Sequence, residues 1–426
     1  MTVLIFVGVL LGFMAFGVPI AFALLLSAIA LMFHLSFFDT QILAQNMLTG
    51  ADSFALMAVP LFMLAGEAMN AGGMSRRMVF LASTFVGHIK GGLGYVAIMA
   101  SILLAALSGS AVADAAALAA MLVPMLRSRG YDMNQATGLI AAGGIIAPII
   151  PPSISFIIFG VAANVSVTKL FMAGIVPGLL MGLTLVVVWA CVSSRSKTIQ
   201  SSPKEPWPIR AKAMKESGWA LMLPVIIIGG LRGGIFTPTE AAAVAAVYAL
   251  FVGMVIYKEI TIKSLYPLLV NAAMTTAIVM FLVAAALVTS YMITLADLPQ
   301  ALIEMLGPLV DSPMLLMFCI VILLILIGTA MDLTPTILIL APVLMPVIKK
   351  AGIDPTYFGV IFIMVGCTGL LTPPVGTVLN VVCGVARIRM EDIIKGVWPY
   401  VLAYTGLIVL LVVFPEIILA PLRWFY

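Results

Sequence analysis

The chain has 426 residues, of which 63% are hydrophobic and only 9% are charged. A soluble domain carries about 25% charged residues, so this composition excludes a soluble enzyme, a disordered chain and a nucleic-acid-binding protein. The net charge of +4 does not indicate an acidic partner, because basic residues in a membrane protein mainly report its orientation.

Continuous apolar runs of about 18 or more residues recur along the chain, and each is long enough to cross a bilayer as a helix. At roughly 20 residues a span, the sequence predicts about ten to thirteen spans. The runs do not alternate as the strands of a β-barrel do. The N-terminus has no basic region before its first apolar run, so we expect no cleaved signal peptide. The predicted fold class is an all-α, polytopic membrane protein.

The first interruption of an apolar run is SGSAVAD at 108–114, which follows the run from Tyr95 to Leu107. It places small residues, hydroxyls and Asp114 inside apolar sequence, which predicts a broken helix near 108–114. An acid at the bilayer centre costs about 2.5–3.5 kcal/mol, so we expect Asp114 to face a cavity, an ion or a partner. The alternative is a small-residue helix contact with the acid near the membrane surface.

The second interruption is a double proline, Pro151–Pro152, in GGIIAPIIPPSISFIIFG at 143–160. Proline lacks an N–H and disrupts the helix around the carbonyl four residues earlier, so this segment is not one unbroken helix. A re-entrant hairpin over 138–164 fits best, and a proline-kinked spanning helix is the alternative. The hydroxyls expected at the hairpin tip are those of Ser153 and Ser155.

The most polar stretch of the chain is 194–217, which holds six basic residues and three prolines. By the positive-inside bias it is expected to be a cytoplasmic loop or interfacial helix. It divides the chain into a first half, 1–193, and a second half, 218–426.

Glu240 lies in GGIFTPTEAAAVAA (233–246), which opens an alanine-rich helix. Thr237 or Thr239 is placed to cap this helix, and an acid in a first helical turn is favourable. A capping role and a role in an ion or substrate path both remain open for Glu240.

The second half carries the same two kinds of interruption. GTAMDLTP at 328–335 places Asp332 in apolar sequence, and GCTGLLTPPVGTVLNVVCG at 366–384 carries Pro373–Pro374. These predict a broken helix near 328–335, a hairpin over 357–386 and a C-terminal helix. The polar side chains near the second double proline are Thr372, Thr377 and Asn380.

The two halves also align without a gap at residues that interrupt or cap helices. The aligned pairs are Pro124 with Pro346, Gly130 with Gly352, Asp132 with Asp354, Gly144 with Gly366, and Pro151–Pro152 with Pro373–Pro374. Proline, glycine and aspartate punctuate backbone structure, so the matches predict an internal repeat. Such repeats in transporters are often inverted. Inversion fits a cytoplasmic basic segment and an N-terminus on the outside, with no Lys or Arg before Arg76; a parallel duplication remains the alternative.

These features predict transport. Unwound carbonyls and Ser/Thr hydroxyls are ligands for hard cations such as Na⁺, and the N-termini of broken helices attract an anion. Two related cation sites are therefore expected beside one anion site. The sequence has no P-loop, no HExxH and no GxSxG, so it lacks these ATPase and hydrolase signatures, and no enzyme activity is expected.

SGSAVAD, GGIIAPIIPPS, GIFTPTEAAA and LLTPPVG in this order resemble the large membrane subunit of TRAP (tripartite ATP-independent periplasmic) transporters. The resemblance covers essentially the whole chain. It implies Na⁺-coupled import of an organic acid across the bacterial inner membrane by an elevator-type fold with two inverted repeats. It also implies two partners, a small four-helix membrane subunit on a separate chain and a periplasmic substrate-binding protein.

The resemblance places candidate Na⁺ ligands at Ser108, Gly109, Ser110, Pro151, Ser153, Gly328, Thr329, Asp332, Gly366, Thr372 and Pro373. Candidate substrate residues are Asp114, Pro152, Ser155, Glu240, Pro374, Thr377 and Asn380. The whole sequence looks most similar to the sialic-acid and keto-sugar-acid members, with sialic acid as the leading substrate. The alternatives are a C4-dicarboxylate or keto-sugar-acid subunit, and a free-standing Na⁺/dicarboxylate symporter of related fold.

Overall fold

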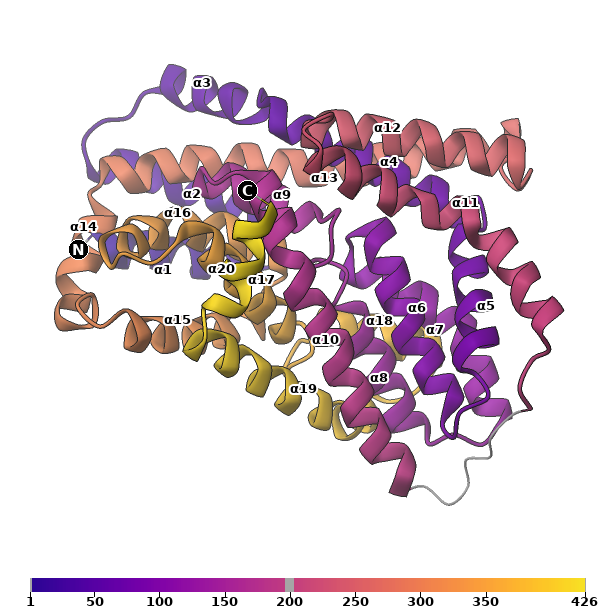
Figure 1. Cartoon of the computed structure of the whole chain (residues 1–426). Helices are drawn as coiled ribbons and strands as arrows, with labels where there is room; N and C mark the ends of the chain where they lie inside the picture. Colours follow the sequence, from indigo (N-terminus) through magenta and orange to yellow (C-terminus); the bar gives the residue numbers. More distant parts are fainter. Residues whose placement is uncertain (1, 196–202, 426) are drawn as a thin grey trace.

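The computed structural model describes residues 2–195 and 203–425, and these residues form helices and connecting loops without a β-strand (Figure 1). The helices of the first half are α1 (Thr2–Ala15), α2 (Ile20–His34), α3 (Thr40–Ala51), η1 (Phe54–Met57), α4 (Ala58–Ala71), α5 (Met74–Val86), α6 (Gly92–Ser108), α7 (Ala111–Ser128), α8 (Met133–Gly144), α9 (Ile154–Ala163) and α10 (Val167–Arg195).

The helices of the second half are α11 (Trp207–Arg232), α12 (Pro238–Phe251), η2 (Val252–Ile256), α13 (Ile262–Leu295), α14 (Leu298–Leu306), η3 (Gly307–Leu309), α15 (Pro313–Gly328), α16 (Leu333–Lys350), α17 (Pro355–Gly369), α18 (Thr377–Ala386), α19 (Met390–Val413) and α20 (Glu416–Phe425). The end of the predicted basic segment is therefore the start of α11, and its residues 196–202 lie outside the described residues.

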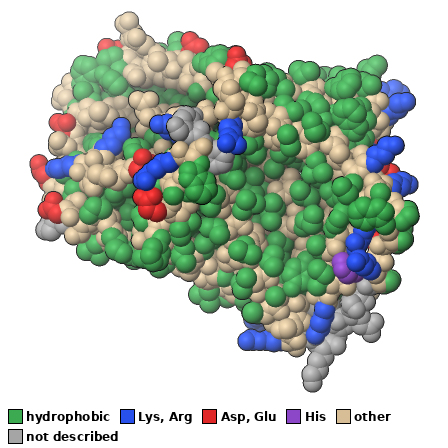
Figure 2. Space-filling view, viewed as in Figure 1, with side chains coloured by type: hydrophobic (Ala, Val, Ile, Leu, Met, Phe, Trp, Pro, Cys, Tyr) green, Lys and Arg blue, Asp and Glu red, His purple; other side chains and the backbone are tan. Residues whose placement is uncertain are grey.

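Apolar surface and helix length both fit a membrane protein. The described residues include eight helices that are long and apolar enough to cross a membrane, by length and composition. Several of the remaining apolar helices, such as α8 with α9 and α17 with α18, are half-length pieces separated by breaks. Hydrophobic side chains cover most of the face that Figure 2 shows. Helices satisfy their own backbone hydrogen bonds, which lipid cannot do for them.

The long helix α10 shows how the first half is arranged. Near its C-terminal end, the Trp189 indole donates a hydrogen bond to the Gly91 carbonyl at 2.9 Å and stacks on Tyr131 at 6.3 Å between ring centroids. Near its middle, Gly174 and Gly178 pack on Ile149 and Ile150 of the first break. At its beginning, Val167 packs on Gly160 of α9. The unit α8–α9 therefore runs the whole length of α10, as Figure 1 also shows.

The unit α6–α7, by contrast, turns back on itself. The Leu93 amide at the start of α6 donates to the Tyr131 hydroxyl just beyond the end of α7, at 3.3 Å. Both ends of the unit therefore meet at the C-terminal end of α10. The reversal occurs at Gly109, whose φ of 64° lies in the left-handed region that glycine adopts without strain.

The second half repeats this arrangement. The Tyr357 hydroxyl at the start of α17 donates to the Leu411 carbonyl near the end of α19, at 3.1 Å. Residues 387–389 join α18 to the start of α19, so α17–α18 runs the length of α19. The helices α15 and α16 both line one apolar cavity of about 450 Å³. Ile327 lines it near the connection between the two helices, and Leu316 and Leu344 line it farther along α15 and α16. They form the second hairpin.

These contacts correct the sequence-based assignment of the two interruptions in each half. The segments predicted as hairpins, 138–164 and 357–386, are broken helices that continue to the other end of the molecule. The segments predicted as broken helices, near 108–114 and 328–335, are the tips of hairpins. The reason is that a double proline ends a helix without fixing the direction in which the next helix leaves.

The two halves are inverted. Gly138 of α8 packs on Gly396 of α19, where a Cβ atom would lie 2.7 Å from the Gly396 carbonyl carbon, so α8 and α19 begin at the same end. We call this end, where Tyr131 and Trp189 meet, the basic end. Its basic residues include Lys90, Arg127, Arg129, Arg195, Arg387 and Arg389. The hairpin α6–α7 opens here.

The hairpin α15–α16 opens at the opposite end, because α16 ends at Lys350 shortly before α17 begins there. At that end Gly359 of α17 packs on Phe159 and Leu170 of the first half. The second arm of each hairpin packs on the other half, α7 against α18 and α16 against α9. The predicted all-α fold, with a hairpin and a broken helix in each of two inverted repeats, is confirmed. The helices α2, α3, α4, α11, α12 and α13 pack on one another beside these units.

We predict that Gly396→Leu destabilises the protein, because a side chain there would overlap the Asn134 carbonyl of α8. Overpacking of this kind costs about 1–3 kcal/mol. The control is Gly406→Leu on the same helix, where no atom lies within 4 Å of an added Cβ. Thermal unfolding of both purified variants in detergent checks this. Equal melting temperatures would contradict the close α8–α19 crossing.

Candidate functional site

The first hairpin tip rests on the first helix break. A Cβ atom at Gly109 would lie 2.6 Å from the Pro152 carbonyl oxygen and 3.2 Å from the Ser153 Cα atom. Only glycine fits this approach, and only glycine adopts the backbone angle at low cost. The structure thus brings together the two segments of the first half in which the family resemblance placed candidate Na⁺ ligands, 108–110 and 151–153.

Hydrogen bonds within the tip fix its shape. The Ser108 hydroxyl donates to Oδ1 of Asp114 and accepts from the Ser110 amide at 3.2 Å. Ser110 in turn caps α7 by accepting from the Ala113 amide at 3.4 Å. Asp114 is 3% exposed, and its second oxygen, Oδ2, has no partner among the described residues. Asp114 stabilises the tip by accepting the hydrogen bond from Ser108, and it does not line the central cavity described below.

The first break is held by a serine. Ser153 is fully buried, donates its hydroxyl to the Pro148 carbonyl and accepts from the Phe156 amide at 3.2 Å, which caps α9. Its side chain therefore has a structural task. Ser155, the second residue of α9, lines the central cavity instead.

The second tip rests on the second break in a related way. A Cβ atom at Gly369 would lie 2.7 Å from the Gly328 Cα atom, so the two glycines allow close contact. The Val375 amide donates to the Thr329 carbonyl at 3.2 Å. The Thr329 and Thr372 hydroxyls donate to carbonyls in their own helices, those of Leu326 at 2.7 Å and Thr368 at 3.0 Å. Hydroxyl and carbonyl oxygens thus gather at this contact too.

Asp332 is the acid of the second tip. It occupies the N-cap position of α16, but its side chain makes no capping hydrogen bond. Its side chain is exposed and lines the central cavity. It differs in this from Asp114, which is buried behind the first tip.

The central cavity, of about 90 Å³, lies where the two hairpin tips meet. Both tips, both breaks and the neighbouring helices α4 and α13 line it. Its lining residues are Met63, Gly109, Ser110, Ala111, Val112, Pro148, Ile154, Ser155, Val279, Asp332, Leu333, Thr334 and Leu370. Of the predicted site residues, it receives Gly109, Ser110, Ser155 and Asp332.

Sequence reasoning missed several of these lining residues. Met63 and Val279 belong to long apolar helices, where nothing in the sequence distinguishes one apolar position from the next. Pro148 carried a signal that was available, because it lies three residues before the double proline in the same break.

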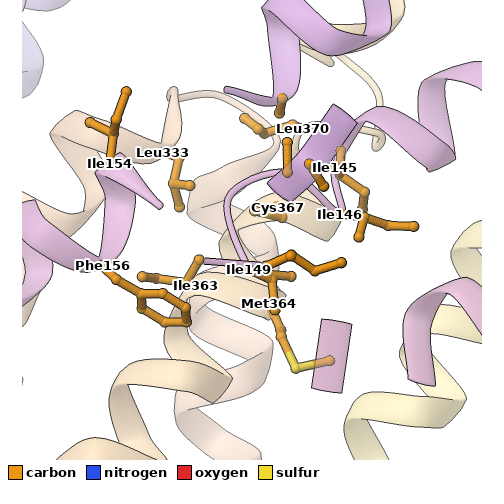
Figure 3. Close-up of a cluster of buried hydrophobic side chains, with 14 of the residues drawn as sticks. Ile145, Ile146, Ile149, Ile154, Phe156, Leu333, Ile363, Met364, Cys367 and Leu370 are labelled. Atoms are coloured by element: carbon orange, nitrogen blue, oxygen red, sulfur yellow. The ribbon is translucent and has the colours of Figure 1, made fainter. Parts of the chain in front are cut away.

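An apolar cluster packs behind the cavity (Figure 3). Ile145, Ile146 and Ile149 of the first break lie close to Met364 and Cys367 of α17. Leu333 and Leu370 take part in this cluster and also line the cavity. The cluster joins the two repeats directly behind the site, so that the tips and breaks are held as one unit.

Other predicted residues lie away from the cavity. Pro151, Pro152 and Gly366 are buried beside it. Both double prolines contain a cis peptide bond, and Pro373 is half-buried while Pro374 is exposed. The Asn380 side chain is exposed and donates to the Val375 carbonyl at 2.7 Å. The Thr377 hydroxyl is buried without a partner among the described residues.

The structure corrects the assignment of Glu240 as a candidate substrate residue. Its carboxylate accepts from the amide and the hydroxyl of Thr237, both at 2.8 Å, and the Thr237 hydroxyl accepts from the Glu240 amide at 3.3 Å. This is a capping box at the start of α12, and the Glu240 side chain is exposed. The structure supports the capping role and does not bring Glu240 to the cavity.

Comparison with known proteins identifies the family of this chain. Residues 7–417 match the family described as "Tripartite ATP-independent periplasmic transporter, DctM component". The chain belongs to this family. It is the large permease component of a TRAP transporter for organic acids, and such permeases work with a small membrane subunit and a periplasmic binding protein.

Several relatives cover all or nearly all of this permease. It is 56% identical to the 2,3-diketo-L-gulonate TRAP transporter large permease protein YiaN of Escherichia coli, over all of both chains. It is 39% identical to the sialic acid TRAP transporter large permease protein SiaM of Vibrio cholerae, over 95% of each chain. The crystal structure of the Alcanivorax borkumensis YdaH transporter matches with a TM-score of 0.65 and 19% identity, over 88% of this chain and 87% of that one. This last likeness concerns the fold alone.

We predict that Gly109→Ala strongly reduces transport, because the added methyl group would overlap the Pro152 carbonyl and separate tip from break. Gly130→Ala is the matched control. Gly130 also has a left-handed φ, of 69°, but nothing lies within 4 Å of an added Cβ. Both variants bear a backbone cost of about 1–2 kcal/mol. Uptake per folded molecule should fall more than about tenfold only for Gly109→Ala. Equal uptake by the two variants would show that the contact is not needed.

Proposed function

We propose that this permease imports an organic acid by coupling its movement to Na⁺, at the cavity between the two hairpin tips. The observation that carries the proposal is that the acid Asp332 lines that cavity, beside two tip–break contacts at which carbonyl and hydroxyl oxygens gather. Hard cations take oxygen ligands of these kinds.

Asp332 gives a physical reason for coupling. An anionic substrate in this cavity would be repelled by the Asp332 carboxylate, by about 4 kcal/mol for unit charges 4 Å apart at an effective dielectric constant near 20. The residues that line the cavity include no Lys or Arg. A cation bound at the second tip removes this repulsion, so the acid enters favourably only after Na⁺ has bound.

The relatives support one substrate class more than another. The leading expectation from the sequence, sialic acid, has less support than a keto-sugar acid. The relative named for 2,3-diketo-L-gulonate is 56% identical over the whole chain, and the one named for sialic acid is 39% identical. We propose a six-carbon keto-sugar acid, delivered by a periplasmic binding protein to a complex of this chain with its small subunit.

The orientation and the movement are part of the proposal. We assign the basic end to the cytoplasm by the positive-inside bias and propose that the N-terminus, which no Lys or Arg follows before Arg76, is periplasmic. The tips and breaks are held together by the apolar cluster behind the cavity. We propose that they move as one body against the helices beside them, as in an elevator.

Reconstituted uptake tests the function. The chain, its small subunit and its binding protein are placed in liposomes, and uptake of radiolabelled 2,3-diketo-L-gulonate and of sialic acid is measured with and without an inward Na⁺ gradient. We expect accumulation of the keto-sugar acid only with Na⁺ and the binding protein. Accumulation without the binding protein would favour a free-standing symporter, and equal flux without Na⁺ would contradict coupling.

We predict that Asp332→Asn weakens the dependence of uptake on Na⁺, because it removes the charge that the cation neutralises. The Na⁺ concentration for half-maximal uptake should rise about tenfold, or the apparent number of Na⁺ ions should fall. Glu240→Gln, an acid in the capping box, should leave both values unchanged. A Na⁺ dependence for Asp332→Asn that matches the unmodified protein would remove Asp332 from the cation path.

We predict the orientation from accessible cysteines in a background with the four native cysteines replaced. Lys204→Cys should resist a membrane-impermeant maleimide added to spheroplasts, and Lys349→Cys at the opposite end should react. All three positions of the stretch 203–205 and both Lys349 and Lys350 are exposed, so burial does not explain a difference. Labelling at 204 but not at 349 would reverse the assignment.

A further inference from the structure

A second cavity lies at the basic end, between the ends of α7 and α18. Its volume is about 560 Å³, within the range of sites that hold small organic ligands. Arg127 and Arg387 line it, over a floor of small and apolar residues that includes Ala120, Val123 and Pro124. The central cavity, by contrast, has no basic side chain in its lining.

The two arginines are held at the edge of this cavity. The Arg127 guanidinium donates through Nη2 to the Ala386 carbonyl at 2.8 Å, which ties α7 to the end of α18. Arg387 follows directly, with a left-handed φ of 52°. The residue that follows α9 in the first half, Asn164, has nearly the same φ of 53°. Asparagine tolerates this conformation and arginine does so less well, so backbone shape does not account for an arginine at 387.

Two nearby acids form their contacts with other groups and not with these arginines. Asp392 pairs with Arg389 at 3.1 Å, and Asp132 accepts from the Asn134 amide at 2.9 Å as the cap of α8. The Arg127 and Arg387 side chains are both exposed to the cavity. Two guanidinium groups over an apolar floor suit a carboxylate with a carbon chain, because guanidinium binds carboxylate in a bidentate way.

One face of α7 leads from the central cavity to this one. Val112 lines the central cavity, and the face continues through exposed Ala113, half-buried Ala117, and exposed Ala120 and Pro124 to Arg127. Beside it, α18 exposes Asn380 and Gly384, and exposed Arg387 follows its last residue. We call these residues the α7–α18 face. Among the described helices, α18 packs chiefly on α7, α8 and α19, which leaves this face open.

The α7–α18 face differs from surfaces that meet lipid. The exposed side chains of α15 are large and apolar, such as Met314, Ile322 and Leu326. Apart from Met125 and Val385, the exposed side chains of α7 and α18 are small or polar. An exposed amide such as that of Asn380 is costly against hydrocarbon. This composition fits a water-lined passage better than a contact with acyl chains.

We propose that the Arg127–Arg387 cavity is a second binding site for the carboxylate of the transported acid, at the cytoplasmic mouth of a passage along the α7–α18 face. The proposal rests on the proposed function for its ligand and on the basic end for its side of the membrane. The site collects the anion released from the central cavity and passes it to the cytoplasm. It sets the affinity on the cytoplasmic side and leaves Na⁺ binding at the tips untouched.

The test measures each side of the membrane separately, in proteoliposomes of known orientation with 2,3-diketo-L-gulonate as the probe. Arg387→Gln should raise the half-saturating concentration on the cytoplasmic side about tenfold, as expected for loss of a hydrogen bond to a charged group. The half-saturating concentrations of substrate and Na⁺ for uptake should stay unchanged. Arg387→Lys should give an intermediate value, and Arg389→Gln, whose arginine pairs with Asp392, is the control.

The outcomes distinguish failure of the second binding site from failure of the proposed function. Equal cytoplasmic half-saturation for Arg387→Gln and Arg389→Gln overturns the second site, as does a loss of bound anionic phospholipid in native mass spectrometry with transport unchanged. Absence of Na⁺-driven uptake in the unmodified protein contradicts the proposed function instead. If Arg127→Gln fails to fold because the link to Ala386 is lost, the exposed Arg387 variants still decide the question.

Discussion

The contact of each hairpin tip with the neighbouring helix break is the constraint on which the rest of the structure depends. A helix that ends inside a membrane leaves backbone groups that lipid cannot satisfy. Here each tip covers a break, through Gly109 on Pro152 in the first half and Gly328 on Gly369 in the second. The same close approach that shields these groups concentrates carbonyl and hydroxyl oxygens at one place. The contact that shields the backbone is therefore also the place at which we propose that Na⁺ binds.

Inversion of the repeats brings these two contacts together. Because one hairpin opens at the basic end and the other at the opposite end, their tips meet in the middle of the molecule. One small cavity then receives residues from both tips and both breaks, with Asp332 exposed in it. The apolar cluster of Figure 3 packs residues of both halves against one another, and two of its members, Leu333 and Leu370, also line the cavity.

The sequence predicted where helices end better than how they are connected in space. The residues of SGSAVAD and of the two double prolines lie at helix ends as expected, since glycine and proline act locally on the backbone. The assignment of hairpin and broken helix was reversed between the two kinds of interruption. A hairpin and a continuing broken helix differ only in long-range contacts such as that of Leu93 with Tyr131. The capping roles of Ser153 and Glu240 also depend on hydrogen-bond geometry, which the sequence does not show. Met63 lines the cavity, but nothing in the neighbouring sequence indicates that it does.

A high-resolution cryo-EM structure of the complex with Na⁺ and a keto-sugar acid is the most direct test of the central claim. We expect cation density between each tip and its break, and density for the acid in the cavity beside Asp332. Both densities should disappear when choline replaces Na⁺. Density for the acid in the cavity without Na⁺, or cations bound away from the tip–break contacts, would show that the tips do not couple the acid to Na⁺.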